Sequence, residues 1–160
     1  MYEYKCKILR VVDGDTVDVD IDLGFGMWMH KERVRMMGID TPESRTRDKV
    51  EKLFGLAAKA HLKSLLPVGS MQVLKTEIDR SGEDKKGKFG RILGDFLLED
   101  RRATEQMIVD GHAVNYHGGS LRVVACHSNG EAVPAVVVHH IQEETRKGLF
   151  DLDFYHDLQQ

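Results

Sequence analysis

The chain has 160 residues, of which 41% are hydrophobic and 31% are charged, and its formal net charge at pH 7 is -3. This length suits one domain with a buried core, so we expect a single domain over residues 1–160. The negative charge argues against a protein that coats nucleic acid through bulk positive charge, because such domains are usually basic. It is compatible with an enzyme that acts on nucleic acid, because a metal site needs its own carboxylates.

No apolar run in the sequence reaches the roughly 18–20 residues that a membrane span needs, so we expect no membrane partner. The first residues, Met1 to Lys5, lack the apolar core of a signal peptide. Cys6 and Cys126 are too few for a disulfide framework and indicate free thiols. We therefore expect a cytoplasmic protein, while a mature secreted form without its leader stays open.

Three strands are predicted in the N-terminal part of the chain. Residues 2–12 predict the first, and Asp13-Gly14 predicts a hairpin turn after it. Residues 16–23 alternate apolar and polar side chains, which is typical of a half-buried strand whose aspartate face meets solvent rather than a metal. Residues 24–31 are predicted as a loop whose apolar tip packs under the fold or meets a partner, and residues 32–37 as the third strand.

From Val50 the apolar residues recur at helical spacing, and the predicted helix ends at Leu66-Pro67. Its mostly apolar stripe consists of Phe54, Ala57, Ala58, His61, Leu62 and Leu65. We interpret His61 as a histidine at the edge of the core rather than as a ligand or a base.

The C-terminal half is predicted to begin with two strands, Met71–Ile78 and Arg91–Leu98. A short helix follows, with Thr104 as its N-cap and Asp110-Gly111 at its end. Residues 123–141 favour two further strands around an Asn-Gly turn. Five main strands, with helices after the third and the fifth, predict an α+β fold on a small antiparallel barrel of the oligonucleotide-binding (OB) size.

The stretch Val34 to Glu43 combines one arginine, Arg35, with two acids, Asp40 and Glu43. Thr41-Pro42 within it favours extended backbone and blocks helix formation. Carboxylate oxygens suit hard cations, and a planar guanidinium suits phosphate, so the stretch can hold both together. Taken alone, it is equally compatible with a strand that ends in a solvated acidic turn.

Two further motifs change that balance. Asp13-Gly14-Asp15-Thr16 precedes a strand, and Lys88-Phe89-Gly90-Arg91 lies at the end of a glycine- and lysine-rich loop predicted to begin at Asp79. Together with Asp40-Thr41-Pro42-Glu43, and in this order, they resemble the staphylococcal nuclease (thermonuclease) family. The resemblance covers about residues 4–118 and implies a five-stranded antiparallel OB-fold β-barrel with packed helices. Residues 120–160 are atypical of the family, so we expect two or three helices.

The resemblance implies a metal site. In the family, the residues at Asp15 and Asp40, with the backbone carbonyl of Thr41, hold one Ca²⁺ ion, and Asp13 supports that site from nearby. The activity that it implies is a sugar-non-specific, calcium-dependent endonuclease that hydrolyses DNA and RNA, with single strands preferred.

The remaining roles also come from the resemblance. Glu43 corresponds to the residue that activates or positions the attacking water, and Arg35 and Arg91 to the arginines on the phosphate. Three residues are implied as substrate contacts, namely Lys88, Phe89 and Tyr116.

Two other functions stay open from the sequence. One is a catalytically silent module of the same fold that binds nucleic acid or protein, although such modules typically lose site acids or arginines. The other is a structural calcium-binding barrel, which paired arginines disfavour because cations repel a calcium ion. The partners expected for the enzyme are DNA and RNA, and we expect a monomer, with a dimer through the tip Met27 to Met29 left open.

Overall fold

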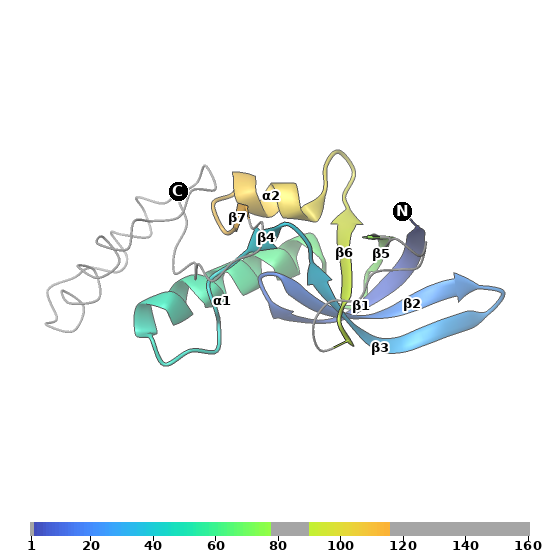
Figure 1. Ribbon diagram of the computed structural model, residues 1–160, viewed down its shortest axis with the longest axis horizontal. Helices are drawn as coiled ribbons and strands as arrows, with labels where there is room; N and C mark the ends of the chain where they lie inside the picture. The colour runs from blue at the N-terminus through green and yellow to red at the C-terminus, as the bar shows by residue number, and fades with distance from the viewer. Residues whose placement is uncertain (1, 78–89, 116–160) are drawn as a thin grey trace, which may run out of the picture.

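The computed structural model describes residues 2–77 and 90–115, and they form a closed five-stranded barrel with two helices (Figure 1). The strands follow one another around the barrel in the order β1-β2-β3-β6-β5. Their bounds are Glu3–Asp13 for β1, Thr16–Gly24 for β2, Met27–Met36 for β3, Met71–Thr76 for β5 and Ile92–Leu97 for β6. The α+β fold and the OB-type barrel predicted from the sequence are confirmed.

One strand pair departs from the predicted antiparallel barrel. β3 and β6 run parallel, with Val34 beside Ile92 and Met36 beside Gly94. The other four pairs around the barrel are antiparallel. Strand directions cannot alternate all the way around a closed ring with an odd number of strands. At least one parallel pair is therefore a geometric requirement, and here it lies at the seam between β3 and β6.

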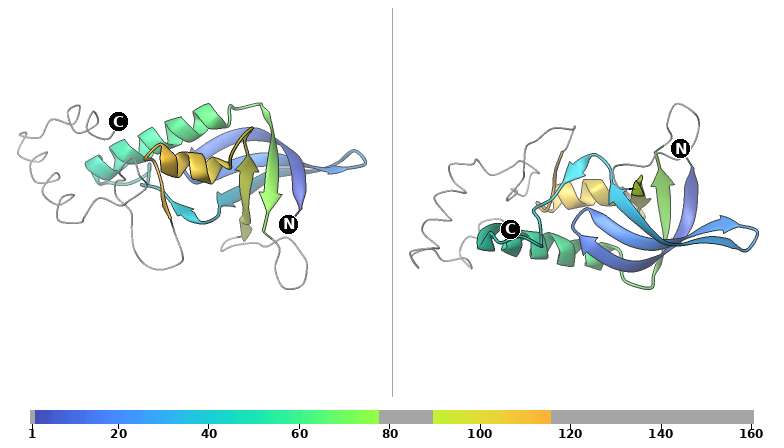
Figure 2. Two further views of the ribbon diagram at one scale, coloured as in Figure 1. Left: turned by 90° about the horizontal axis from the view of Figure 1, so that it is seen from above. Right: turned by 60° about the horizontal axis from the view of Figure 1, so that its bottom comes forward.

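The β2–β3 hairpin extends away from the barrel as a two-stranded ribbon (Figures 1 and 2). The loop predicted for residues 24–31 is wrong, because β3 already begins at Met27. Phe25 and Gly26 make the turn, both with positive φ like Gly24 at the end of β2, and the Phe25 side chain is fully exposed. The predicted packing of the tip is also wrong, since of its apolar side chains only Met29 packs against the core. The alternation that marks a half-buried strand was missing because the ribbon is exposed on both faces.

Helix α1, Lys49–Leu65, packs along one end of the barrel (Figure 2). Asp48 is its N-cap, and its Oδ1 accepts hydrogen bonds from the backbone N–H groups of Val50 (3.0 Å) and Glu51 (3.1 Å). These bonds satisfy two of the donors that the first turn of a helix leaves unpaired. The helix predicted from the apolar stripe is confirmed.

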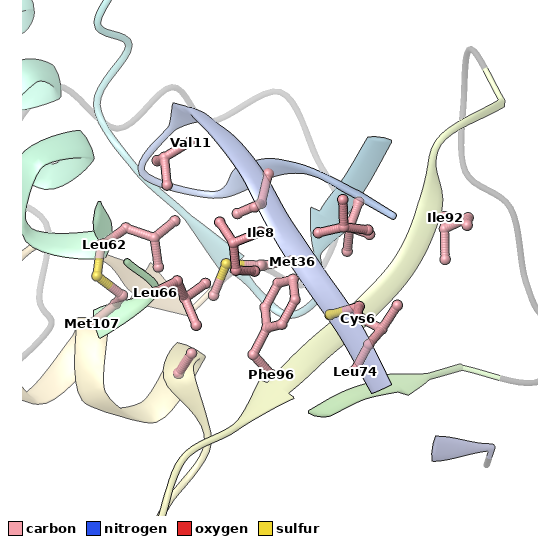
Figure 3. Close-up of a cluster of buried hydrophobic side chains, with 14 of the residues drawn as sticks. Cys6, Ile8, Val11, Met36, Leu62, Leu66, Leu74, Ile92, Phe96 and Met107 are labelled. Atoms are coloured by element: carbon pink, nitrogen blue, oxygen red, sulfur yellow. The ribbon is translucent and has the colours of Figure 1, made fainter. Parts of the chain in front are cut away.

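Figure 3 shows the core, which fills the barrel and continues under α1. Phe96, Ile8 and Met36 are fully buried inside it, and Leu62 and Met107 extend it to the two helices. Cys6 is a free thiol in this core, and burial raises its pKa to about 12.

Helix α2 spans Ala103–Val109 and has Arg102 as its N-cap. The predicted N-cap Thr104 is wrong. Its hydroxyl donates to the buried carboxylate of Asp95 on β6, at 2.5 Å, so it ties the helix to the barrel instead of capping it. The predicted C-terminus is confirmed, because Asp110 is the C-cap and Gly111 takes the left-handed conformation with φ 79°.

A second, two-stranded sheet lies outside the barrel and was not predicted. It pairs β4 (Ile39–Asp40) with β7 (Val114–Asn115) in antiparallel orientation. The strands predicted in residues 123–141 lie outside the described residues. Within residues 2–77 and 90–115, no helix is long and apolar enough to cross a membrane.

Candidate nuclease site

Seven of the sequence-predicted site residues meet in one cavity of about 230 Å³. They come from the β1–β2 turn, from β3, from β4 and the chain after it, and from the start of β6. The seven are Asp13, Asp15, Arg35, Asp40, Thr41, Glu43 and Arg91, and Thr16, Pro42 and Arg45 complete the lining. The predicted substrate residues Lys88, Phe89 and Tyr116 lie outside the described residues.

Arg35 lines the cavity and is held by nearby backbone carbonyls. Its Nη1 donates to the carbonyl of Met36 at 2.6 Å, and its Nη2 donates to the carbonyl of Ile39 at 3.0 Å. Nη2 also lies 3.3 Å from Asp15 Oδ2 and 3.7 Å from Asp40 Oδ1. The carbonyl bonds fix the plane of the guanidinium, so its geometry is set before any ligand arrives.

Asp15 and Asp40 place two carboxylates beside that guanidinium. Asp15 is nearly buried, and its Oδ1 accepts from the hydroxyl of Thr16 at 2.9 Å. Burial raises the pKa of Asp40, and the nearby charge of Asp15 raises it further, while Arg35 opposes both effects. A buried carboxylate whose ionisation is disfavoured by a second carboxylate favours an added cation beside the pair.

The oxygen atoms at this position fit a hard cation, with one restriction. In residues 2–77 and 90–115, no group of three histidine, cysteine, aspartate or glutamate side chains is arranged to hold a metal ion. For such a cation, Asp15 and Asp40 would supply two ligands, and backbone oxygens or water would supply the others, as is common for Ca²⁺. Thr41 adds a buried hydroxyl, Oγ1, that has no hydrogen-bond partner in the described part of the chain.

Asp13 connects two of the segments that form the cavity. Its Oδ1 accepts a hydrogen bond from the hydroxyl of Ser44, which is buried in the chain after β4. The β1–β2 turn and the Thr41–Ser44 segment are thus tied together next to the carboxylate pair. Ser44 was not identified from the sequence, because a serine in a polar loop carries no signal of its own.

Helix α1 supports both segments from below through very close packing. A Cβ atom added to Gly14 would lie 2.8 Å from Ala58 Cβ on the helix. One added to Gly55, on the helix itself, would lie 2.2 Å from the carbonyl oxygen of Glu43 and 2.5 Å from Ser44 N. The backbone of each segment therefore contacts the helix directly, at Gly14 and at Gly55. Only glycine, which has no Cβ atom, fits at these two positions.

Glu51 makes the third contact between α1 and these segments, four residues before Gly55. It is only 2% exposed, and its Oε1 accepts from the backbone N–H of Glu43 at 3.4 Å. The pattern Asp48-x-x-Glu51 is that of a capping box, in which the glutamate would accept from Asp48 N. Here Thr46 Oγ1 accepts that N–H at 3.2 Å, and Glu51 accepts from Glu43. This role of Glu51 was not predicted from the sequence.

His61 lies away from the cavity, where α1 meets the end of α2. Its Nε2 is 2.6 Å from Asp110 Oδ2, and its ring stacks on that of His112 with 4.6 Å between centroids. The prediction of a histidine at the edge of the core, rather than a ligand or base of the site, agrees with this position.

Comparisons with known proteins lead to one family. The family model described as "Staphylococcal nuclease homologue" matches residues 33–124. Thermonuclease of Staphylococcus intermedius is 33% identical over 106 residues, which are 66% of this chain and 56% of that protein. Thermonuclease of Staphylococcus hyicus is 30% identical over 111 residues, 69% of this chain and 59% of that protein.

Endonuclease YncB of Bacillus subtilis is 28% identical over 104 residues, 65% of this chain and 44% of that protein. The matched region thus spans about half the length of these relatives. The family model begins inside β3 and continues past the last described residue, so it includes Arg35, Asp40, Glu43 and Arg91.

Proposed function

This chain belongs to the staphylococcal nuclease family, and from that premise we propose that it is a calcium-dependent nuclease that hydrolyses DNA and RNA. The observation that carries the proposal is the position of Arg35. Its guanidinium lies within 4 Å of two half-buried or buried carboxylates, in a cavity that Glu43 and Arg91 also line. A cation and a phosphate could be bound there side by side.

In this proposal Asp15, Asp40 and the backbone carbonyl of Thr41 hold one Ca²⁺ ion, and Asp13 steadies the segments around it. When bound, the ion supplies positive charge close to a phosphate oxygen that gains negative charge during hydrolysis. The raised pKa of Asp40 supports this assignment, because burial and the neighbouring charge of Asp15 leave the ionised carboxylate short of positive charge.

Arg35 and Arg91 bind the phosphate in this proposal. The two carbonyl bonds of Arg35 use only part of its five N–H donors, so others remain for phosphate oxygens. Because those bonds fix the guanidinium in advance, no reorganisation is needed as charge develops on the oxygens. A lysine could not reproduce this arrangement, since it presents a point charge on a flexible stem.

Glu43 is the proposed base or positioning group for the attacking water. Its side chain is exposed and lines the cavity, while Glu51 and Gly55 hold its backbone. A firmly held backbone with a solvent-accessible carboxylate suits a group that must orient a water molecule and accept its proton. Every proposed contact addresses phosphate, which supports a substrate range that includes both DNA and RNA.

The test is release of acid-soluble nucleotides from single-stranded DNA and RNA, with Ca²⁺ and with a chelator. Glu43→Gln and Arg35→Lys keep size or charge while removing the base and the planar fork. Each should lower kcat by about a hundred- to a thousandfold, the usual loss for one preorganised group. Glu99→Gln, an exposed glutamate outside the cavity, is the matched control and should leave kcat unchanged. A folded wild type that binds single strands but never cleaves them would instead identify a silent binding module.

A further inference from the structure

A second hollow, of about 560 Å³, adjoins the candidate site on the outside of the barrel. It shares Asp13, Thr16, Arg45 and Arg91 with the site cavity and continues from there along β2 and β3. The residues that line only this second hollow are Val12, Asp18, Lys31 and Arg33. We call it the ribbon groove, because it leads from the cavity toward the exposed β2–β3 ribbon.

Strand register explains why its charged residues lie together. Val34 pairs with Ile92 across the parallel seam, and both side chains point into the core. Side chains alternate along a strand, so the preceding residues, Arg33 and Arg91, lie side by side on the outer face. On the other side of Arg33, its antiparallel partner on β2 is Asp18.

The groove is basic, although the chain as a whole is acidic. Its lining has four cationic side chains, those of Lys31, Arg33, Arg45 and Arg91, and two carboxylates, those of Asp13 and Asp18. The whole chain has a formal charge of -3, so this local excess of positive charge is not a property of its composition. A basic groove on an acidic domain is a candidate site for a polyanion.

Both carboxylates of the groove are engaged by protein groups. Asp18 accepts from Nε and Nη2 of Arg33 at 2.8 and 3.2 Å, and Asp13 accepts from Ser44. The Arg33 side chain nevertheless stays 48% exposed, and Lys31 and Arg45 are exposed as well. Asp18 therefore holds Arg33 at the groove, while Lys31 and Arg45 remain exposed to a ligand.

We propose that the ribbon groove binds the phosphates of the nucleic-acid strand beyond the bond held in the cavity. This inference rests on the proposed nuclease function, because it extends the substrate path of the same site. Arg33 and Arg35 lie two residues apart on β3, about 7 Å along the strand, and they would contact successive parts of one backbone. None of the residues that line the groove is aromatic, so the contacts are with phosphate and independent of base sequence.

The test compares a dinucleotide with a twelve-nucleotide strand as substrates of the full chain. Lys31→Gln and Arg33→Gln should each raise KM for the long strand about threefold to tenfold, in keeping with loss of a phosphate contact. Neither should change kcat or the dinucleotide KM, because the short substrate does not reach the groove. Asp18→Asn should act in the opposite direction and lower the long-strand KM, since it removes a negative charge from the groove.

Salt dependence gives a second readout that a change in folding would not imitate. Binding of the long strand, measured by fluorescence anisotropy in a Glu43→Gln background, should weaken with salt. The slope of log K against log salt should fall by about 0.7 for each contact removed from a single strand. The control is Lys63→Gln, which removes the same charge from an exposed position in the last turn of α1.

The outcomes separate this inference from the nuclease proposal. If wild type cleaves both substrates and the groove variants match the Lys63→Gln control, the ribbon groove does not bind the strand. The nuclease proposal is then unaffected. If wild type never cleaves but binds the long strand with the predicted dependence on Lys31 and Arg33, binding by the ribbon groove is supported and the nuclease proposal fails. An equal rise in KM for the dinucleotide and the long strand would also contradict binding by the groove, because it would place Lys31 and Arg33 at the catalytic cavity.

Discussion

The carboxylate of Glu51, buried on helix α1, accepts a hydrogen bond from the backbone N–H of Glu43, with 3.4 Å between nitrogen and oxygen. Burying a carboxylate costs free energy unless its surroundings compensate it. Here the compensation includes the backbone that carries the proposed catalytic glutamate. Folding of the helix and placement of the Glu43 side chain are therefore linked through one contact.

Glu51→Ala should lower kcat with little change in KM, because it loosens Glu43 and leaves Arg35 and Arg91 in place. It should also cost about 1–3 kcal/mol of folding free energy, since a part-buried N–H loses its acceptor. Glu51→Gln keeps an oxygen acceptor at the same distance and should recover most of both losses. Steady-state kinetics and urea unfolding of the two variants check this prediction. A rise in KM without a fall in kcat would contradict it.

Gly55→Ala should destabilise the protein, although the reverse is expected for an ordinary helix. In a helix interior, alanine is favoured over glycine by about 1 kcal/mol. Here the new Cβ would lie 2.2 Å from the Glu43 carbonyl oxygen and 2.3 Å from its carbonyl carbon, so the chain after β4 must move. We expect a lower midpoint of thermal unfolding and a loss of nuclease activity.

The control for Gly55→Ala is Leu56→Ala, because Leu56 is the next residue of the helix and is 46% exposed. Surface substitutions of this kind usually change stability by no more than about 0.5 kcal/mol. An increase in thermal stability of Gly55→Ala, with activity retained, would show that the helix and the Glu43 backbone are not in fixed contact.

Asp110 should make folding stability depend on pH. Burial raises the pKa of its carboxylate, but hydrogen bonds from Gln106 and His61 and the charge of His112 outweigh burial, so the pKa is lowered overall. A lowered native pKa means that ionised Asp110 stabilises the fold above its unfolded pKa of about 3.9. This contribution is lost as pH falls through the lower native value.

Asp110→Asn should therefore cost about 1 kcal/mol at pH 7, a value discounted for partial exposure of the pair. The difference between variant and wild type should shrink as pH falls below about 4. Urea unfolding between pH 7 and pH 2.5 measures it, with Asp100→Asn, an exposed aspartate before α2, as the control. A difference that is constant over this range would rule out the carboxylate charge as its source.

The barrel could be predicted where one face of a strand is buried. Residues 16–23 alternate cleanly because Val17, Val19 and Ile21 enter the core while the aspartates between them face outward. Prediction failed where this asymmetry is absent, as in Met27 to Lys31 on the exposed ribbon. It also failed for the two-residue strands β4 and β7, which are too short to show any period.

Seven of the ten residues that line the cavity were predictable, because they lie in or near three short motifs of fixed order. The residues that support this lining could not be predicted, because their role depends on contacts between segments that are distant in the sequence. Nothing in the sequence around Glu51 or Gly55 indicates that both contact the Glu43 backbone. The prediction of Thr104 as an N-cap failed for the same reason, since its hydroxyl donates to Asp95 on strand β6.

The parallel seam between β3 and β6 has a consequence for how the protein gains and loses its site. Arg35 and Arg91 are far apart in the sequence and line one cavity only because these two strands are joined. That seam involves three residue pairs, fewer than any other junction of the barrel. Local opening there would separate the two guanidinium groups while most of the hydrophobic core remained intact. Activity should thus report closure of the ring, and on heating it should vanish before the bulk of the secondary structure melts.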